Sequence, residues 1–313
     1  MRTGREATDL ITLAHLAVLG LISVVAVTSA TIGSAEDFWS SSGFRQLVYL
    51  GIGIGLYLVV QRIDYHDWAD MWVLLYAAGV LALLALPWLA RPISGARSWL
   101  ELGPLRIQPS EPMKVITALA VAAFLAEARD KLSLVRLVQL GILVGLPMGL
   151  IVVQPDMGTA LTFVPLFLGV AWLAGIRGKV LISLALIGAL ALPILWFGVL
   201  EPYQKERVLT VFDPERDPSG SGYQVIQSRI AVGSGQITGK GLFRGSQSRL
   251  DFLPARETDF VLAVIAEETG SVGVLVVLGV YLSLLLRTLQ TAAISQDPLG
   301  AYLAVGVASL WAG

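Results

Sequence analysis

Charged residues stand at the edges of apolar segments in three parts of the chain. Glu111 and Lys114 occur in GARSWLELGPLRIQPSEPMK, Asp156 occurs in QPDMGTAL, and Asp259 lies near the end of GSQSRLDFLPARETDF. Ionisable residues at membrane depth usually face a polar interior and mark a functional site. These residue types therefore predict a polar cavity lined by carboxylates and by at least one lysine.

The first two groups also have a structural interpretation, which the sequence alone leaves open. Glu111 and Lys114 are three residues apart, so they can form an ion pair on one face of a helix that Ser110 caps. Asp156 can cap a helix that begins at Met157, because helix N-termini favour an acid. Capping does not exclude a place in a site.

The third group lies at the start of a long apolar segment. If a helix already runs at Asp259, then Asp259, Ala263 and Glu267 share one face. Glu267 and Glu268 are adjacent carboxylates about two turns into this segment, which is costly unless a polar cavity or partner charges receive them. In the alternative interpretation, both glutamates lie in the headgroup region and Asp259 merely begins a helix, capped by Thr258.

The elements that position these residues follow from composition. The chain has 313 residues, of which 55% are hydrophobic and only 14% are charged, whereas soluble domains carry about 25% charged residues. A helix needs about 20 apolar residues to span a membrane. Apolar segments occur at about 10–32, 46–63, 71–90, 113–126, 134–153, 158–175, 179–200 and 260–286. We predict an all-α polytopic membrane protein, a helical bundle of eight complete spans plus the start of a ninth at residue 301.

Several classes of site are excluded or unsupported. The chain has no cysteine, which excludes disulfides and thiolate metal sites. Its two histidines, His15 and His66, are too few and too far apart for a histidine-rich metal site. A net charge of −1 gives no case for nucleic acid. The stretch GSGQITGKG resembles a phosphate-binding loop, but its spacing fails and Lys240 is followed by Gly241 instead of Ser or Thr.

The connections between spans indicate an orientation. The two long connections, 91–112 and 201–259, lie on the same side as the 154–157 turn if successive spans alternate. Once the 201–259 loop is discounted, Lys and Arg are more frequent on the side of the N-terminus, which predicts a cytoplasmic N-terminus. We expect residues 1–313 to form one transmembrane domain, with 201–259 as a large extracytoplasmic loop. Within that loop, YQVIQSRIAV predicts a short amphipathic helix.

Four separated motifs, in the same order, resemble the SEDS family (shape, elongation, division and sporulation). They are GARSWLELGPLRIQPSEPMK, QPDMGTAL, DPERDPSGSGYQVIQSRIAVGSG and SQSRLDFLPARETDFVLAVIAEETG. The similarity runs from the first span to the end of the eighth. The wording GSQSRLDFLPARETDF is more similar to the RodA branch of the family than to the division branch, FtsW.

The resemblance implies a ten-span protein of the cytoplasmic membrane that polymerises peptidoglycan from lipid II on the outer face, here for cell-wall elongation. It implies that Asp259 is the catalytic acid and that Glu111, Lys114 and Asp156 surround a central polar cavity. It also implies a class B penicillin-binding protein as partner, the transpeptidase that crosslinks the strands. The family continues through two more spans after the eighth, with a Pro/Gly-rich, serine-containing segment between them, whereas this chain ends at Gly313, inside the ninth apolar segment.

The chemistry of glycosyl transfer is consistent with these residues. A carboxylate at position 259 can act as general base for an attacking sugar hydroxyl. Lys114, Arg106 or a bound divalent cation (Mg or Mn) can balance the charge of a departing diphosphate, and Glu267 is a further candidate for substrate binding. Two alternatives remain open: a flippase that moves lipid II across the membrane, and a non-enzymatic scaffold for the transpeptidase.

Overall fold

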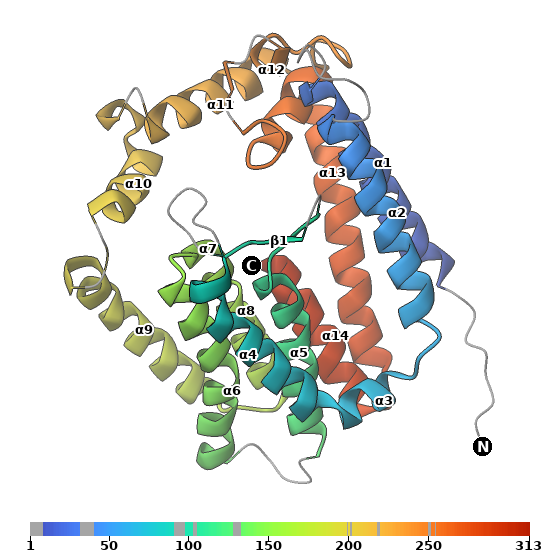
Figure 1. The fold of residues 1–313 in the computed structure, drawn as a ribbon, viewed down its shortest axis with the longest axis vertical. Coiled ribbons are helices and arrows are strands. Elements are labelled where there is room, and N and C mark those ends of the chain that lie inside the picture. The colour runs from blue at the N-terminus through green and yellow to red at the C-terminus, as the bar shows by residue number, and fades with distance from the viewer. Residues whose placement is uncertain are drawn as a thin grey trace. The chain divides into compact units, whose positions relative to one another are not determined.

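A computed structural model describes most of the chain as helices. The described residues are 9–31, 41–90, 98–102, 105–127, 133–198, 200, 202–217, 220–249, 252–253 and 255–313. They divide into two compact units, Met1–Val60 with Ala189–Leu284, and Gln61–Gly188 with Leu285–Gly313. Figure 1 shows the order of the elements along the chain.

The first unit is built from long apolar helices followed by a set of short ones. Its elements are α1 (Leu10–Thr31), α2 (Ser42–Val60), the second half of α9 (Gly178–Gly198), α10 (Pro202–Phe212), the 3₁₀ helix η2 (Pro214–Arg216), α11 (Ser221–Gly235), α12 (Ser246–Arg249) and most of α13 (Val261–Ile294). The helix predicted from YQVIQSRIAV is confirmed as α11. The connection between α9 and α13 is therefore largely helical where it is described.

Helix α1 lies along α13 in the antiparallel direction, and polar contacts fix the pairing. Near one end, the Ser29 hydroxyl donates a hydrogen bond to Glu268 Oε1 (2.5 Å). Nearer the other, His15 Nε2 lies 2.9 Å from Ser283 Oγ, while its Nδ1 lies 2.6 Å from the Ile11 carbonyl. At a rise of 1.5 Å per residue, these two contacts are about 20 Å apart along the helices. Figure 1 shows α1 and α13 side by side.

Helix α13 is kinked at Gly270. This glycine has φ of 69° and ψ of −169°, inside a helix of 34 residues. A Cβ at this position would lie 2.3 Å from the Ile237 carbonyl oxygen, so only glycine fits between the two segments. In return, the backbone N–H groups of Ser271 and Val272 donate to the carbonyls of Gln236 and Ile237. At the kink, the backbone of α13 therefore forms hydrogen bonds with the segment that contains Gln236 and Ile237.

The second unit is a helical bundle arranged around one central helix. Its elements are α3 (Tyr65–Asp70), α4 (Trp72–Leu89), the strands β1 (Leu100–Leu102) and β2 (Leu105–Ile107), α5 (Ser110–Ala126), α6 (Leu134–Val153), α7 (Met157–Leu161), α8 (Phe163–Leu173), the first half of α9, the end of α13 and α14 (Pro298–Ala312). Helix α5 contributes buried residues on all sides, and its core is rich in alanine. Small side chains let neighbouring helices approach closely.

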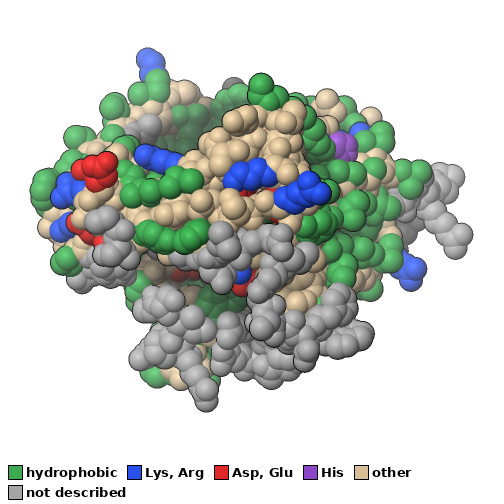
Figure 2. Space-filling view, turned by 90° about the horizontal axis from the view of Figure 1, so that it is seen from above, with side chains coloured by type: hydrophobic (Ala, Val, Ile, Leu, Met, Phe, Trp, Pro, Cys, Tyr) green, Lys and Arg blue, Asp and Glu red, His purple; other side chains and the backbone are tan. Residues whose placement is uncertain are grey.

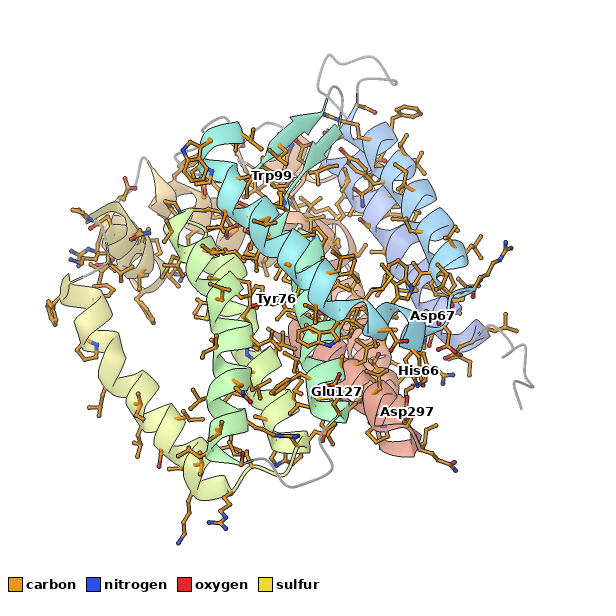
Figure 3. All side chains as sticks on the ribbon, turned by 60° about the horizontal axis from the view of Figure 1, so that its bottom comes forward. His66, Asp67, Tyr76, Trp99, Glu127 and Asp297 are labelled. Carbon is orange, nitrogen blue, oxygen red and sulfur yellow. The ribbon has the colours of Figure 1, made fainter. Side chains whose placement is uncertain are left out.

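Close approach is most evident between α5 and α14. A Cβ on Gly306 would lie 3.3 Å from the Cβ of Ala118 on α5 and 3.3 Å from Leu166 on α8. The ninth apolar segment of the sequence is therefore packed into the core of this unit. Between α4 and α6, the Tyr76 hydroxyl donates to the Leu143 carbonyl (2.7 Å); Figure 3 labels Tyr76 on α4.

A polar tether joins α3 to the start of α14. Asp297 caps α14 by accepting from the backbone N–H groups of Leu299 and Gly300. The same carboxylate accepts a hydrogen bond from the Tyr65 hydroxyl (2.7 Å), and its Oδ2 lies 3.2 Å from His66 Nε2. Figure 3 shows His66 and Asp297 next to each other. The tether therefore attaches the connection between α2 and α4, which contains α3, to the start of α14.

The predicted membrane bundle is confirmed at the level of its long helices. Among the described residues, five helices are long and apolar enough to cross a membrane, namely α1, α2, α4, α6 and α13, and shorter apolar helices cover 157–173, 178–190 and 298–312. The total of eight spans stays a prediction, as does the single domain. The predicted all-α class is confirmed, and the structure adds one small antiparallel hairpin, formed by β1 and β2, that the sequence did not predict. Strands of three residues are too short for alternation to reveal them.

Candidate functional site

Asp156 is held by side chains and backbone from two connections of the second unit. It is the N-cap of α7, where its Oδ1 accepts from the Thr159 backbone N–H (3.2 Å) and its Oδ2 from the Thr159 hydroxyl (2.9 Å). The predicted capping role is therefore confirmed. Its Oδ2 also accepts from Gln108 Nε2 (2.7 Å), which lies directly before α5. The QPSE and QPD motifs thus meet through this one hydrogen bond.

Glu111 and Lys114 form the predicted ion pair in the first turn of α5. Lys114 Nζ lies 2.9 Å from Glu111 Oε1, and the glutamate side chain is 55% exposed. The prediction that Ser110 caps this helix is wrong, because the cap position belongs to Pro109 and Ser110 is the first helical residue. The Ser110 hydroxyl is buried and has no hydrogen-bond partner among the described residues. The carboxylate of Glu111 remains accessible to solutes.

Arg106 is placed only by its backbone. It lies in β2, where it pairs with Glu101 of β1. Its side chain lies outside what the structure describes, so its predicted contact with a diphosphate stays a prediction. The hairpin brings the chain to Gln108, two residues further on, whose amide holds Asp156. Arg106 therefore lies two residues before Gln108, the residue whose side chain contacts Asp156.

Asp259 lies in a turn directly before α13. The Ala255 carbonyl accepts from the backbone N–H groups of Thr258, Asp259 and Phe260, and the helix itself begins at Val261. The condition under which Asp259 shares a face with Glu267 is therefore not met. The predicted cap by Thr258 is wrong as well, since its hydroxyl donates to the Ala255 carbonyl (3.3 Å). The carboxylate of Asp259 is exposed.

Glu267 and Glu268 are buried, and other parts of the first unit receive their charges. Lys240 Nζ lies 2.6 Å from Glu267 Oε1, and the Glu267 side chain has no exposed surface. The backbone N–H groups of Ser246 and Gln247 also donate to Glu267 (2.8 and 3.0 Å). Glu268 Oε1 accepts from the backbone N–H of Gly245 (3.3 Å), in addition to its bond from α1. The requirement for partner charges is thus met by Lys240.

The surface at the end of the molecule with α11 and α12 carries both charged and apolar side chains (Figure 2). Figure 2 looks onto the molecule from the end at which Figure 1 shows α11 and α12. Basic and acidic side chains there alternate with hydrophobic ones. Exposed apolar residues of this part of the first unit include Val208, Val211, Phe212, Ile230 and Val232. This mixture is typical of helices that lie at a membrane interface.

Comparison with known proteins decides the family. A family model for FtsW, RodA and SpoVE, described as "Cell cycle protein", matches residues 6–313. The chain belongs to the SEDS family.

Individual relatives agree with this assignment. The Escherichia coli K12 protein named peptidoglycan glycosyltransferase MrdB is 38% identical over 283 residues, which cover 88% of this chain and 76% of that protein. A probable peptidoglycan glycosyltransferase FtsW of Trichlorobacter lovleyi is 36% identical, over 97% of this chain and 81% of that protein. The predicted family and the predicted class of enzyme, a glycosyltransferase, are thereby confirmed.

A solved structure confirms the fold of this SEDS protein. The structure is named "Structural coordination of polymerization and crosslinking by a peptidoglycan synthase complex". One of its chains matches with a TM-score of 0.80 and 32% identity, covering 97% of this chain and 84% of that one. The chain is therefore a multi-pass helical membrane protein with the fold of this relative.

Sequence reasoning missed two polar residues of this SEDS protein that hold predicted site residues in place. Gln108 holds Asp156, and the signal is the repeated Gln-Pro before an acid in the two motifs. Lys240 holds Glu267, and its only signal is that two buried carboxylates require a cation from elsewhere. The glycine-rich sequence around Lys240 resembles a phosphate-binding loop, but in the structure the partner of Lys240 is a carboxylate of the same chain.

A metal site has no support from the described side chains. Within the described ranges, no group of three or more His, Asp or Glu residues is arranged to hold an ion. The chain has no cysteine to add. A divalent cation (Mg or Mn) at the diphosphate thus stays a prediction, in which substrate oxygens would supply much of the coordination.

Proposed function

We propose that the chain is a peptidoglycan glycosyltransferase that polymerises lipid II, with Asp259 as the general base. The observation that carries the proposal is the contrast among the acids of the first unit. Asp259 is an exposed carboxylate in the turn before α13, whereas Glu267 and Glu268 on that helix are buried. Of these three, Asp259 is free to take a proton from a substrate. Family membership supplies the reaction class.

The proposed step is a displacement at an anomeric carbon. Asp259 accepts the proton of the C4 hydroxyl of one lipid-linked sugar, and the hydroxyl oxygen forms a bond to the anomeric carbon of the growing chain. The bond from that carbon to the undecaprenyl diphosphate breaks, and the diphosphate leaves with the electron pair. Lys114 and Arg106 are proposed to balance its charge, with Glu111 and Asp156 as further contacts to substrate.

The orientation and the partner are part of the same proposal. A cytoplasmic N-terminus puts Asp259 on the outer side of the cytoplasmic membrane, where lipid-linked sugars are joined. The relative of known structure belongs to a peptidoglycan synthase complex that combines polymerisation and crosslinking. We propose that this chain works in the same way with a class B penicillin-binding protein, which supplies the transpeptidase.

The test is polymerisation of lipid II by purified protein together with its transpeptidase partner. Asp259→Asn keeps the size of the side chain but removes the base, so glycan synthesis should fall by about 10²- to 10⁴-fold. Glu257→Gln is the matched control, because it removes a carboxylate two residues away and should leave the rate unchanged. Polymerisation by Asp259→Asn at the wild-type rate would overturn the assignment of the base.

The same preparation separates the alternative functions. A flippase moves lipid II between the leaflets of a vesicle without forming polymer. A scaffold does neither, but still binds the transpeptidase. Glycan chains that require Asp259 support the proposed enzyme, and either of the other two outcomes contradicts it.

The role in elongation rests on the motif GSQSRLDFLPARETDF, which is more similar to the RodA branch. Overall identity does not separate the branches, since relatives named MrdB and FtsW are 38% and 36% identical. We propose elongation and rod shape as the biological role. Expression in rod-shaped cells depleted of their own elongation polymerase should restore the rod. Rescue only of cells depleted of the division polymerase would overturn this part of the proposal.

A further inference from the structure

The segment that precedes Asp259 is fastened to α13 by the two buried glutamates. Glu267 Oε1 accepts from Lys240 Nζ (2.6 Å), from the Ser246 backbone N–H (2.8 Å) and hydroxyl (3.0 Å), and from the Gln247 backbone N–H (3.0 Å). Lys240 Nζ also donates to the Ser246 hydroxyl (2.8 Å). The Glu267 carboxylate therefore accepts hydrogen bonds from both ends of the segment 240–247, which we name the clasp loop.

Backbone contacts reinforce the attachment. The backbone N–H groups of Lys240 and Gly241 donate to the carbonyls of Glu267 and Glu268 (3.0 and 2.9 Å). Gly239, at φ of 76°, is so close that a Cβ there would lie 2.1 Å from the Glu268 carbonyl oxygen. The clasp loop is thus held at the backbone as well as through the side chain of Lys240.

A continuous path leads from the clasp loop to Asp259. The Gln247 carbonyl accepts from the backbone N–H of Leu253 (3.3 Å). The Leu253 side chain is buried in a small apolar cluster with Ala263 and Val264, in the first turn of α13. The turn that carries Asp259 begins two residues after Leu253. Both ends of the segment between Gln247 and α13 are therefore anchored on the same helix.

We propose that Lys240 and Glu267 form a positioning pair that fixes the place of Asp259, an inference that rests on Asp259 being the general base proposed above. Glu267 has no exposed surface and each of its contacts described here comes from the clasp loop. A carboxylate in this setting orders the loop and does not contact substrate. This role replaces substrate binding, which the sequence alone suggested for Glu267.

The pair should affect the rate of reaction more than the binding of substrate. A base displaced by about 1 Å can cost about 100-fold in rate, whereas loss of a substrate contact raises KM. Lys240→Met removes the cation of the ion pair, and Glu267→Gln removes its anion. We expect both to lower kcat for lipid II polymerisation by at least about tenfold with little change in KM. Lys240→Arg keeps the charge and should retain most of the activity.

A second readout does not depend on activity. The chain has no native cysteine, so Glu257→Cys accepts a single spin label two residues from Asp259. Lys240→Met or Glu267→Gln should narrow the electron paramagnetic resonance spectrum of this label, because the turn becomes more mobile. Gln46→Leu is the control: it removes a hydrogen bond from Gln46 Nε2 to Ser23 Oγ (2.8 Å) between α1 and α2 and should leave the spectrum unchanged.

The outcomes separate this inference from the proposed function. An unchanged label spectrum in both variants of the pair, or a raised KM at unchanged kcat, overturns the positioning role. The Lys240→Met/Glu267→Gln double variant should be no worse than the poorer single variant, because the two residues act as one unit; additive losses would also overturn it. If Asp259→Asn remains active, the proposed base is wrong, while the label still reports whether the pair orders the turn.

Discussion

Two Glu–Lys ion pairs of similar length occupy very different settings in this molecule. Glu111 and Lys114 are one turn apart on α5, and their side chains are 55% and 21% exposed. Glu267 and Lys240 come from a helix and a distant loop, and their side chains are 0% and 29% exposed. The first pair forms as soon as the helix forms. The second exists only once two separate segments have folded together.

The difference indicates which pair is structural. An exposed pair within one helix contributes little to stability, about 0.3–0.5 kcal/mol. A buried pair is costly to break from one side, because the remaining charge loses its partner away from water. The pair on α5 is thus available for chemistry, whereas the pair on α13 serves to hold the fold around Asp259.

Removing the buried carboxylate should have the largest effect on stability. Glu267→Ala removes the anionic partner of Lys240 and the acceptor of the Ser246 and Gln247 backbone N–H groups, so we expect a loss of about 3 kcal/mol or more. The measurement is thermal unfolding in detergent, followed by the fluorescence of the tryptophans. Glu111→Ala is the matched control and should unfold within about 0.5 kcal/mol of the wild type. Equal losses in the two variants would remove the distinction between the pairs.

Variants of the exposed pair, Glu111 and Lys114, should lose activity without losing stability. Glu111→Gln and Lys114→Met should leave the unfolding temperature nearly unchanged, since a pair of neighbours on one helix turn adds little. If these residues bind the substrate or its leaving group, polymerisation of lipid II should nonetheless fall by about tenfold or more. A variant that unfolds early but remains fully active at low temperature would contradict this assignment.

A third and smaller effect concerns pH and the tether between α3 and α14. The hydrogen bond to Asp64 raises the pKa of His66 above 6.5, and Asp297 raises it further. Burial pushes the pKa of Asp297 up, but hydrogen bonds from Tyr65 and the backbone outweigh it, so the pKa is lowered below 3.8.

The sign of each contribution follows from these directions. The His66 contribution is fully present below pH 6.5 and is lost as pH rises through its raised pKa. The Asp297 contribution is present above pH 3.8 and is lost as pH falls through its lowered pKa. His66→Gln should therefore destabilise the protein more at pH 5.5 than at pH 9, by less than about 1 kcal/mol because the ring is half exposed. Equal effects at both pH values would contradict the ion pair.

The sequence predicted those contacts that are local. The cap at Asp156 and the pair on α5 depend on residues three apart, so spacing alone predicts them. It did not predict the partner of Glu267, which lies 27 residues earlier in a loop without periodicity. The apolar segment predicted from about residue 260 agrees with the start of α13 at Val261. The short hairpin was missed, because it depends on backbone hydrogen bonds that hydropathy does not report.

The bend at Gly270 divides α13 into a short part and a long part. Residues 271–294 alone would extend about 36 Å as a helix, enough for a hydrocarbon layer of about 30 Å. The nine residues before the bend are then not needed to cross the bilayer. The two buried acids, Glu267 and Glu268, lie within these nine residues, so the apolar part of the helix can reach the length of a bilayer without including either carboxylate.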